Sequence, residues 1–153
     1  MKSLTLRIGT IAIALFWGII SANASDFFFD RKMVNNLLVS KIKYEKNYDG
    51  YFEQTFKYDY SYNLNNRIKS IEVRTWDAAT QQWQANHKIT YGYNLPNFVE
   101  LSQWNDKTKS YDKIFEKIEY QINENDEIRY LAVTDKKGNK TEAINHFELL
   151  TEK

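Results

Sequence analysis

The chain has 153 residues, with 21 Lys and Arg against 20 Asp and Glu, no cysteine and one proline. This near-neutral balance lacks the basic excess that binding to nucleic acid or an anionic membrane requires, and the absence of cysteine excludes disulfides, thiolate catalysis, Cys-ligated zinc and a lipid-anchored cysteine. An apolar content of 42% and an aromatic content of 16% are typical of a folded chain, and the length indicates a single domain.

The first 24 residues have the pattern of a secretory signal peptide. Lys2 and Arg7 lead into an apolar run over residues 8–20, and small residues follow at Ala22 and Ala24. A run of 13 residues matches the hydrophobic region of a signal peptide, whereas a membrane-spanning helix needs about 20. We therefore expect cleavage after Ala24, a single domain over residues 25–153 without a stable membrane span, and export to the periplasm or the cell exterior. An uncleaved membrane anchor is the alternative.

The segment over residues 26–38 is apolar but ambiguous. It holds three consecutive phenylalanines, Phe27 to Phe29, and then four more apolar residues up to Leu38. These spacings are compatible with a helix, but we do not assign one. The first strand that we predict lies after this segment and contains Lys41 and Lys43.

A repeat of about 30 residues organises the rest of the chain. Segments that begin at Tyr60, Tyr91 and Tyr120 can be superimposed, and they start 31 and then 29 residues apart. The third segment departs from the others, with Ile122 for a tyrosine and Val133 for a tryptophan, so we expect it to be a terminal cap. Aromatic pairs seven residues apart lie between the segments: Tyr44 and Tyr51, Trp76 and Trp83, Trp104 and Tyr111.

Each repeat shows the alternation of a β-strand. From Trp83 onwards every second residue falls on one face, which places His87 and Ile89 in the same row as Trp83. The same alternation holds over residues 52–62 and 114–122. The sequence therefore predicts an all-β fold: an antiparallel β-meander of about eight strands, built from two-strand repeats of roughly 30 residues, in one long, twisted, open sheet.

The short turns between the long strands end on Asn66, Asn97 and Asp126. Asn and Asp are the residues other than glycine that best tolerate a positive φ, so we predict left-handed backbone at these three positions. Pro96 disfavours the right-handed region for Leu95, and the middle turn is therefore expected to differ from its neighbours.

One stretch of the sequence is similar to a known repeat. Residues 60–68 resemble the tyrosine-aspartate (YD) unit, Y-x-Y-D-x-x-G-R-L, with Asn63 and Asn66 in place of the Asp and the Gly. Together with the W-D/N-x-x-T-x-x-W/Y hairpins and the signal peptide, this unit makes residues 37–141 resemble small secreted proteins of Bacteroidales, catalogued as domain of unknown function 3836. That resemblance implies no activity and supplies no catalytic residues.

The sequence contains few candidates for catalytic or metal-binding residues. Only two histidines are present, His87 and His146, and His87 is expected to be a hydrogen-bonded core or interface residue. The acidic turn over residues 123–127 lacks the central glycine of a calcium loop. We therefore predict no catalytic, cofactor-binding or metal-binding residues and no enzyme. A hydrolase that uses paired carboxylates is the third-ranked alternative, although no pair stands out.

The paired aromatics are the candidate ligand-binding residues. They recur at the same end of successive hairpins, so a sheet would set several rings in a row, and such rings can stack on sugar faces. The competing interpretation is that they cover the hydrophobic face or the hairpin bases. The candidate stacking residues are Trp76, Trp83, Trp104 and Tyr111.

The apolar face of an open sheet must be buried against another layer of protein. The sheet could curl on itself, residues 27–38 could pack over it, or two copies could join as a homodimer. We interpret the chain as an exported, non-enzymatic β-repeat protein that acts as an envelope or extracellular interaction module. The alternative is a carbohydrate-binding module, so the partners to consider are an envelope protein, a glycan or a second copy.

Overall fold

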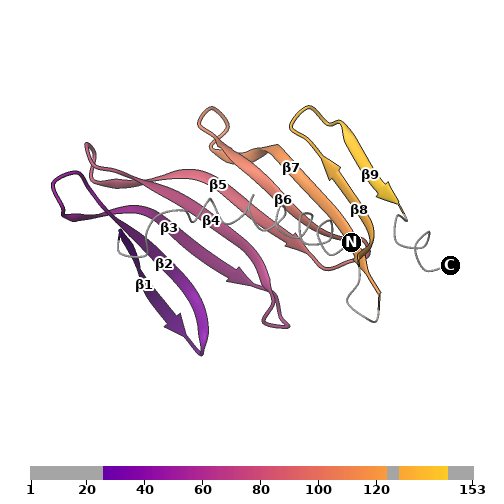
Figure 1. Cartoon of the computed structure of the whole chain (residues 1–153), viewed down its shortest axis with the longest axis horizontal. Helices are drawn as coiled ribbons and strands as arrows, with labels where there is room; N and C mark the ends of the chain where they lie inside the picture. Colours follow the sequence, from indigo (N-terminus) through magenta and orange to yellow (C-terminus); the bar gives the residue numbers. More distant parts are fainter. Residues whose placement is uncertain (1–25, 124–127, 145–153) are drawn as a thin grey trace.

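The computed structural model describes residues 26–123 and 128–144. These residues form one antiparallel sheet in which each strand pairs with the strands before and after it in the chain. The predicted all-β meander is confirmed, and Figure 1 shows it as a long, twisted sheet. The strands are β1 (Phe27–Val34), β2 (Leu37–Lys46), β3 (Phe52–Tyr62), β4 (Ile68–Asp77), β5 (Gln82–Gly92), β6 (Asn97–Asn105), β7 (Ser110–Ile122), β8 (Ile128–Thr134) and β9 (Lys140–Ile144).

Within residues 26–123 and 128–144 the sheet has nine strands rather than about eight, because the ambiguous N-terminal segment forms β1 and not a helix. β1 lies at one edge and pairs with β2 from Phe27 opposite Glu45 to Val34 opposite Leu37. Asn35 and Asn36 join the two strands with φ values of 49° and 63°. Two consecutive positive φ values are what a two-residue hairpin turn requires, and Asn tolerates them.

In the β2–β3, β4–β5 and β6–β7 hairpins, the later strand contains a residue that has no partner in the earlier strand. These residues are Thr55 in β3, Asn86 in β5 and Phe115 in β7, as the register shifts show. Each lies five residues before the first tyrosine of its repeat. The bulge in the backbone therefore recurs with the same period as the sequence repeat. A bulge of this kind exchanges the faces of the residues on either side of it.

The register shift at Asn86 shows that the prediction for β5, in which Trp83 shares a face with His87 and Ile89, is wrong. His87 lies opposite Val73, whereas Trp83 lies opposite Trp76, and residues 73 and 76 of β4 point to opposite faces. Trp83 therefore does not share a face with His87. The same correction applies to the early part of β3 and of β7, which the continuous alternation in the sequence had placed with the later part.

The two faces of the sheet differ in composition. The apolar face is centred on Val73, Ile89 and Ile118, which are 1%, 5% and 6% exposed. The polar face has small buried residues at its centre, namely Ser70, Ser102 and Ala132. Register places the following residues on the apolar face: Phe27, Phe29, Lys41, Lys43, Phe56, Tyr58, Tyr60, Ile71, Val73, His87, Ile89, Tyr91, Val99, Leu101, Glu116, Ile118, Tyr120, Leu131 and Val133.

No second layer covers the apolar face within the described residues. The sheet is open, with β1 and β9 at its two edges, and the described strands contact chiefly their neighbours in the sheet (Figure 1). Two of the three predicted covers are therefore wrong. The sheet does not curl on itself, and the segment from Phe27 to Val34 extends the sheet instead of packing over it.

The predicted turn conformation holds at one of the two positions that the structure describes. Asn66 has a φ of 58°, as expected, but Asn97 does not have a positive φ. The middle turn differs from the first, as Pro96 predicted, and the peptide bond between Leu95 and Pro96 is cis. Asp126 lies outside the described residues.

Candidate functional site

Two of the predicted aromatic pairs are confirmed at the ends of hairpins. The Trp76 and Trp83 rings meet across β4 and β5, with centroids 5.0 Å apart and planes inclined by 61°. The Trp104 and Tyr111 rings meet in the same way across β6 and β7, at 5.0 Å and 65°. Edge-to-face geometry of this kind is favourable, because the positive edge of one ring meets the negative face of the other.

The third predicted pair, Tyr44 and Tyr51, is wrong, because Tyr44 lies opposite Gln54 in β3. Tyr51 is 73% exposed in the loop after β2, and Phe52 occupies the position in β3 that Trp83 occupies in β5. Phe28 of the edge strand β1 lies opposite Tyr44 and contacts both Tyr44 and Phe52. Its ring stacks on Tyr44 at 4.8 Å and meets Phe52 edge to face at 5.1 Å. The sequence did not reveal Phe28, because β1 was not assigned as a strand.

All three aromatic groups lie on the polar face. Trp76 is opposite Trp83, and three residues separate it from Val73 on the apolar face. The Lys88 ammonium, which is ion-paired on the polar face, lies 5.7 Å from the Tyr111 ring centre. We name the set the aromatic row: Phe28, Tyr44 and Phe52, then Trp76 and Trp83, then Trp104 and Tyr111.

A chain of ion pairs borders the aromatic row. We name it the ion-pair ladder, and it crosses β3, β4 and β5 through Lys57, Asp59, Arg74, Glu72 and Lys88, with nitrogen-to-oxygen distances of 3.1, 3.8, 3.5 and 3.3 Å in that order. Burial raises the pKa of Tyr111, and the neighbouring Glu72 adds to that rise. The cations and anions of the ladder pair with one another. The polar face therefore offers hydrogen-bonding groups without a strong positive or negative electrostatic potential.

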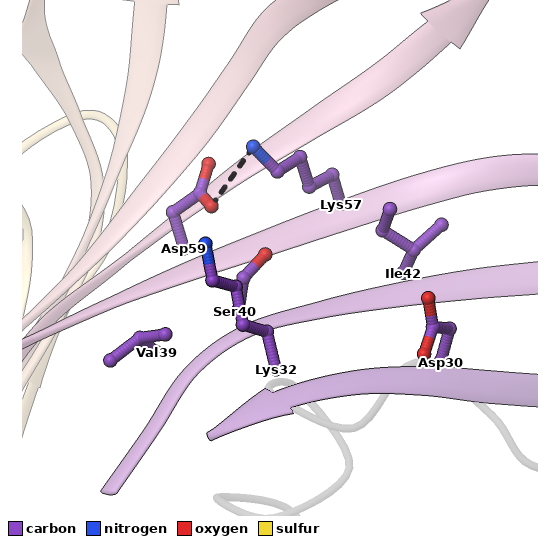
Figure 2. A pocket seen from close by; sticks show the side chains of 7 residues that line it. All are labelled: Asp30, Lys32, Val39, Ser40, Ile42, Lys57 and Asp59. Carbon is purple, nitrogen blue, oxygen red and sulfur yellow. Dashed lines mark ion pairs between the residues drawn. The ribbon is translucent and has the colours of Figure 1, made fainter. Parts of the chain in front are cut away.

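Figure 2 shows a shallow depression on the polar face beside β1, with the Lys57–Asp59 ion pair at one side of it. It is lined by side chains of both charges together with apolar and hydroxyl groups: Asp30, Lys32, Val39, Ser40, Ile42, Lys57 and Asp59. Asp59 is occupied by Lys57 and Arg74, so the lining does not present a free pair of carboxylates.

The polar loop residues act within their own loops. Asp77 accepts hydrogen bonds from the backbone NH of Ala79 at 3.0 Å and from the hydroxyl of Thr80 at 2.7 Å. Asn63 accepts from the backbone NH groups of Asn65 and Arg67, both at 3.0 Å. The Asp-x-x-Thr part of the hairpin motif is therefore explained by turn structure.

The titratable groups of the apolar face do not form a reactive set. His87 is half-buried beside Asn86, and burial lowers its pKa, which keeps its imidazole neutral at pH 7. Burial also raises the pKa of Glu116, which lies beside Leu101. Residues 26–123 and 128–144 contain no group of three or more side chains placed to hold a metal ion. His146 and the acidic turn at 124–127 lie outside the described residues.

The tyrosines of the apolar face are of two kinds. Tyr62 and Tyr93 donate hydrogen bonds to the carbonyls of Leu38 and Ile68, both at 2.8 Å, and so close the ends of neighbouring strands. Among the described residues, the other tyrosine hydroxyls on this face have no hydrogen-bond partner, and they belong to Tyr58, Tyr60, Tyr91 and Tyr120. We name these four the free tyrosines.

A family model described as "Family of unknown function (DUF3836)" matches residues 1–122. The chain belongs to this family. Its fold is similar to solved structures from Bacteroides and Parabacteroides. No curated protein shows significant similarity to the sequence, and no helix in the described part of the chain has the length and hydrophobicity needed to cross a bilayer.

Three solved structures share this fold. A protein of unknown function from Bacteroides fragilis NCTC 9343 has a TM-score of 0.67 and 19% identity, over 78% of this chain and 92% of that one. A DUF3836 protein from Bacteroides vulgatus ATCC 8482 has a TM-score of 0.51 and 24% identity, over 56% of this chain and 87% of that one. A DUF3836 protein from Parabacteroides distasonis ATCC 8503 has a TM-score of 0.53 and 24% identity, over 56% and 81%.

Proposed function

We propose that this protein is an exported, non-enzymatic interaction module of the cell envelope or exterior, and that a second copy of the chain covers its apolar face. The observation that carries this proposal is the set of free tyrosines. Their rings are half-buried in a face that has no covering layer in the described residues, while their hydroxyls have no partner. Tyrosine is enriched in protein interfaces because it buries an apolar ring and keeps one polar group for pairing.

The cations of the apolar face fit the same interpretation. Lys41 lies 4.5 Å from the Phe29 ring centre and 4.6 Å from that of Tyr58, and burial lowers its pKa. A cation held over aromatic rings tolerates further loss of water better than an unpaired one. The face is thus suited to contact with another protein surface.

Measurement of self-association tests whether a second copy of the chain covers the apolar face. Tyr91→Lys places a charge on the apolar face, whereas Thr90→Lys places the same charge at the next residue, on the polar face. Sedimentation of the purified protein at micromolar concentration should show a dimer, and Tyr91→Lys should weaken dimerisation by about tenfold or more, while Thr90→Lys should not. A monomer at every concentration, or equal effects of the two variants, would contradict the second copy.

Export rests on the sequence of residues 1–24. Mass spectrometry of the protein recovered from its host should give a chain that begins at Ser25, outside the cytoplasm. Recovery of the uncleaved chain from the cytoplasm would contradict this part of the proposal.

The second candidate function is carbohydrate binding, and the aromatic row favours it. All three aromatic groups lie on one face and at one end of the sheet, which is the arrangement that stacking on an extended ligand needs. We also propose that residues 60–68 form a YD-like repeat unit, on which the family assignment does not depend.

A further inference from the structure

The spacing within the aromatic row follows from the sheet itself. The Trp76–Trp83 and Trp104–Tyr111 pairs occupy the same position in the β4–β5 and β6–β7 hairpins, whereas the third group extends over β1, β2 and β3. The loops of these hairpins lie along one end of the sheet in Figure 1. These two hairpins are two strands apart, and neighbouring strands are spaced by about 4.7–4.9 Å, so their aromatic pairs lie roughly 9.4–9.8 Å apart across the strands.

We propose that the aromatic row binds an extended, uncharged glycan that runs across the strands, with one aromatic group for each disaccharide step of the chain. This inference rests on carbohydrate binding, the second candidate function, and specifies the shape and direction of the bound glycan. The step of the row matches the length of a disaccharide in an extended β-linked chain. Pyranose rings present C–H groups that pack on the negative face of an aromatic ring, so each group supplies one stacking position.

The surroundings of the row favour a hydroxyl-rich ligand. The ion-pair ladder places both carboxylates and ammonium groups beside the rings, and Lys88 connects it to Tyr111. Sugar hydroxyls donate and accept hydrogen bonds, so they can use both kinds of group. The ladder has three cations and two anions paired with one another, which gives little attraction for a strongly charged polymer.

A proline-rich peptide is the competing occupant. A polyproline helix advances about 9.3 Å per turn and docks on aromatic grooves, so its period is also close to that of the row. Its backbone offers only carbonyl acceptors, which would leave the carboxylates of the ladder unmatched. The indole NH of Trp104 is also already bonded to Asp106 at 3.1 Å and is not free to donate to such a peptide.

The test is a titration of the purified protein with β-1,4-linked gluco-, xylo-, manno- and chito-oligosaccharides of increasing length, followed by tryptophan fluorescence and calorimetry. For at least one series, affinity should rise by roughly fivefold or more each time the oligosaccharide becomes long enough to reach another aromatic group. Trp83→Ala should remove one of these rises. Trp83→Phe keeps an apolar ring beside Trp76 and should give a partial loss in a protein that remains folded.

The control is His87→Ala, which truncates a ring of the same strand on the opposite face and should leave glycan affinity unchanged. Binding that is independent of oligosaccharide length would support carbohydrate binding but would contradict the proposal that each aromatic group binds one disaccharide step. The absence of a response to all four series, or binding of a polyproline peptide alone, would overturn both. Neither outcome bears on dimerisation through the apolar face, because sedimentation measures that separately.

Discussion

The two faces of this sheet are built from the same strands but protect their centres in different ways. On the polar face, small residues such as Ser70 and Ala132 are buried beneath long charged side chains that pair with one another. On the apolar face, Val73 and Ile89 are buried by larger neighbouring rings, and no second layer follows in the described residues. The charged groups of the polar face therefore pair with one another, whereas the apolar face leaves the free tyrosines for a second copy of the chain.

Stability and self-association are expected to depend mainly on the apolar face of this single-layer protein. Ion pairs near a surface contribute little each, typically below about 1 kcal/mol, so the ladder mainly keeps the polar face soluble and ordered. Burial of apolar side chains contributes more, at about 0.8 kcal/mol for each buried methylene group. Substitutions at matched positions on the two faces can test this division directly.

The largest difference is expected between Val73→Ala and Ser70→Ala. Val73 is 1% exposed at the centre of the apolar face, so loss of its two methyl groups should lower the free energy of unfolding by about 2–3 kcal/mol. Ser70 is equally central on the polar face and shares a 2.7 Å hydrogen bond with the Ser61 hydroxyl, so its loss should cost about 1 kcal/mol. Urea unfolding measures both, and equal costs would contradict the proposed division between the faces.

Gly92→Ala is expected to have an intermediate effect, of about 1–2 kcal/mol. On the polar face the Phe98 ring lies directly over Gly92, and a Cβ there would be 1.9 Å from Cε1 of Phe98. The ring must therefore move away, together with Lys117, whose ammonium lies 5.1 Å from the ring centre. In a Phe98→Ala background the same Gly92→Ala change should cost less. An unchanged cost there would show that the ring is not the obstacle.

The smallest effect is expected from the free tyrosines at alkaline pH. Burial raises the pKa of Tyr60 from 10.0 to about 12, so the folded state disfavours its ionised form. The corresponding stability is present below pH 10 and is lost as the pH rises towards 12. Unfolding measured across this range should depend less steeply on pH in Tyr60→Phe than in the unmodified protein. The fully exposed Tyr48 provides the control, since Tyr48→Phe should leave the slope unchanged.

Much of the fold could be predicted from local sequence. Period-two alternation identified the strands, and the spacing of seven residues identified Trp76 with Trp83 and Trp104 with Tyr111 as partners across hairpins, because chain reversal in a short loop brings such residues opposite each other. Asn66 in left-handed backbone followed from the conformational tolerance of asparagine.

Other features could not be predicted for identifiable reasons. The left-handed residues Gln81 and Lys109 close two loops, although neither residue type signals such a turn. β1 was missed because its apolar spacing fits a helix as well as a strand. Phe28 was missed with it, since its partners Tyr44 and Phe52 lie on other strands and only pairing of β1 with β2 brings them together.

The sequence by itself determined a repeating antiparallel meander, with aromatic pairs at the ends of its hairpins, because alternation and loop length are local properties of the chain. Only the tertiary structure decided which face each residue occupies. Thr55 and Asn86 each add one unpartnered residue to a strand, and that shift moves Phe52 and Trp83 to the polar face. In β7 two shifts, at Phe115 and again close to Tyr111, set the face of Tyr111. Because both faces contain large apolar side chains, the alternation in the sequence runs through these points without a break, and only the register of strand pairing reveals the change.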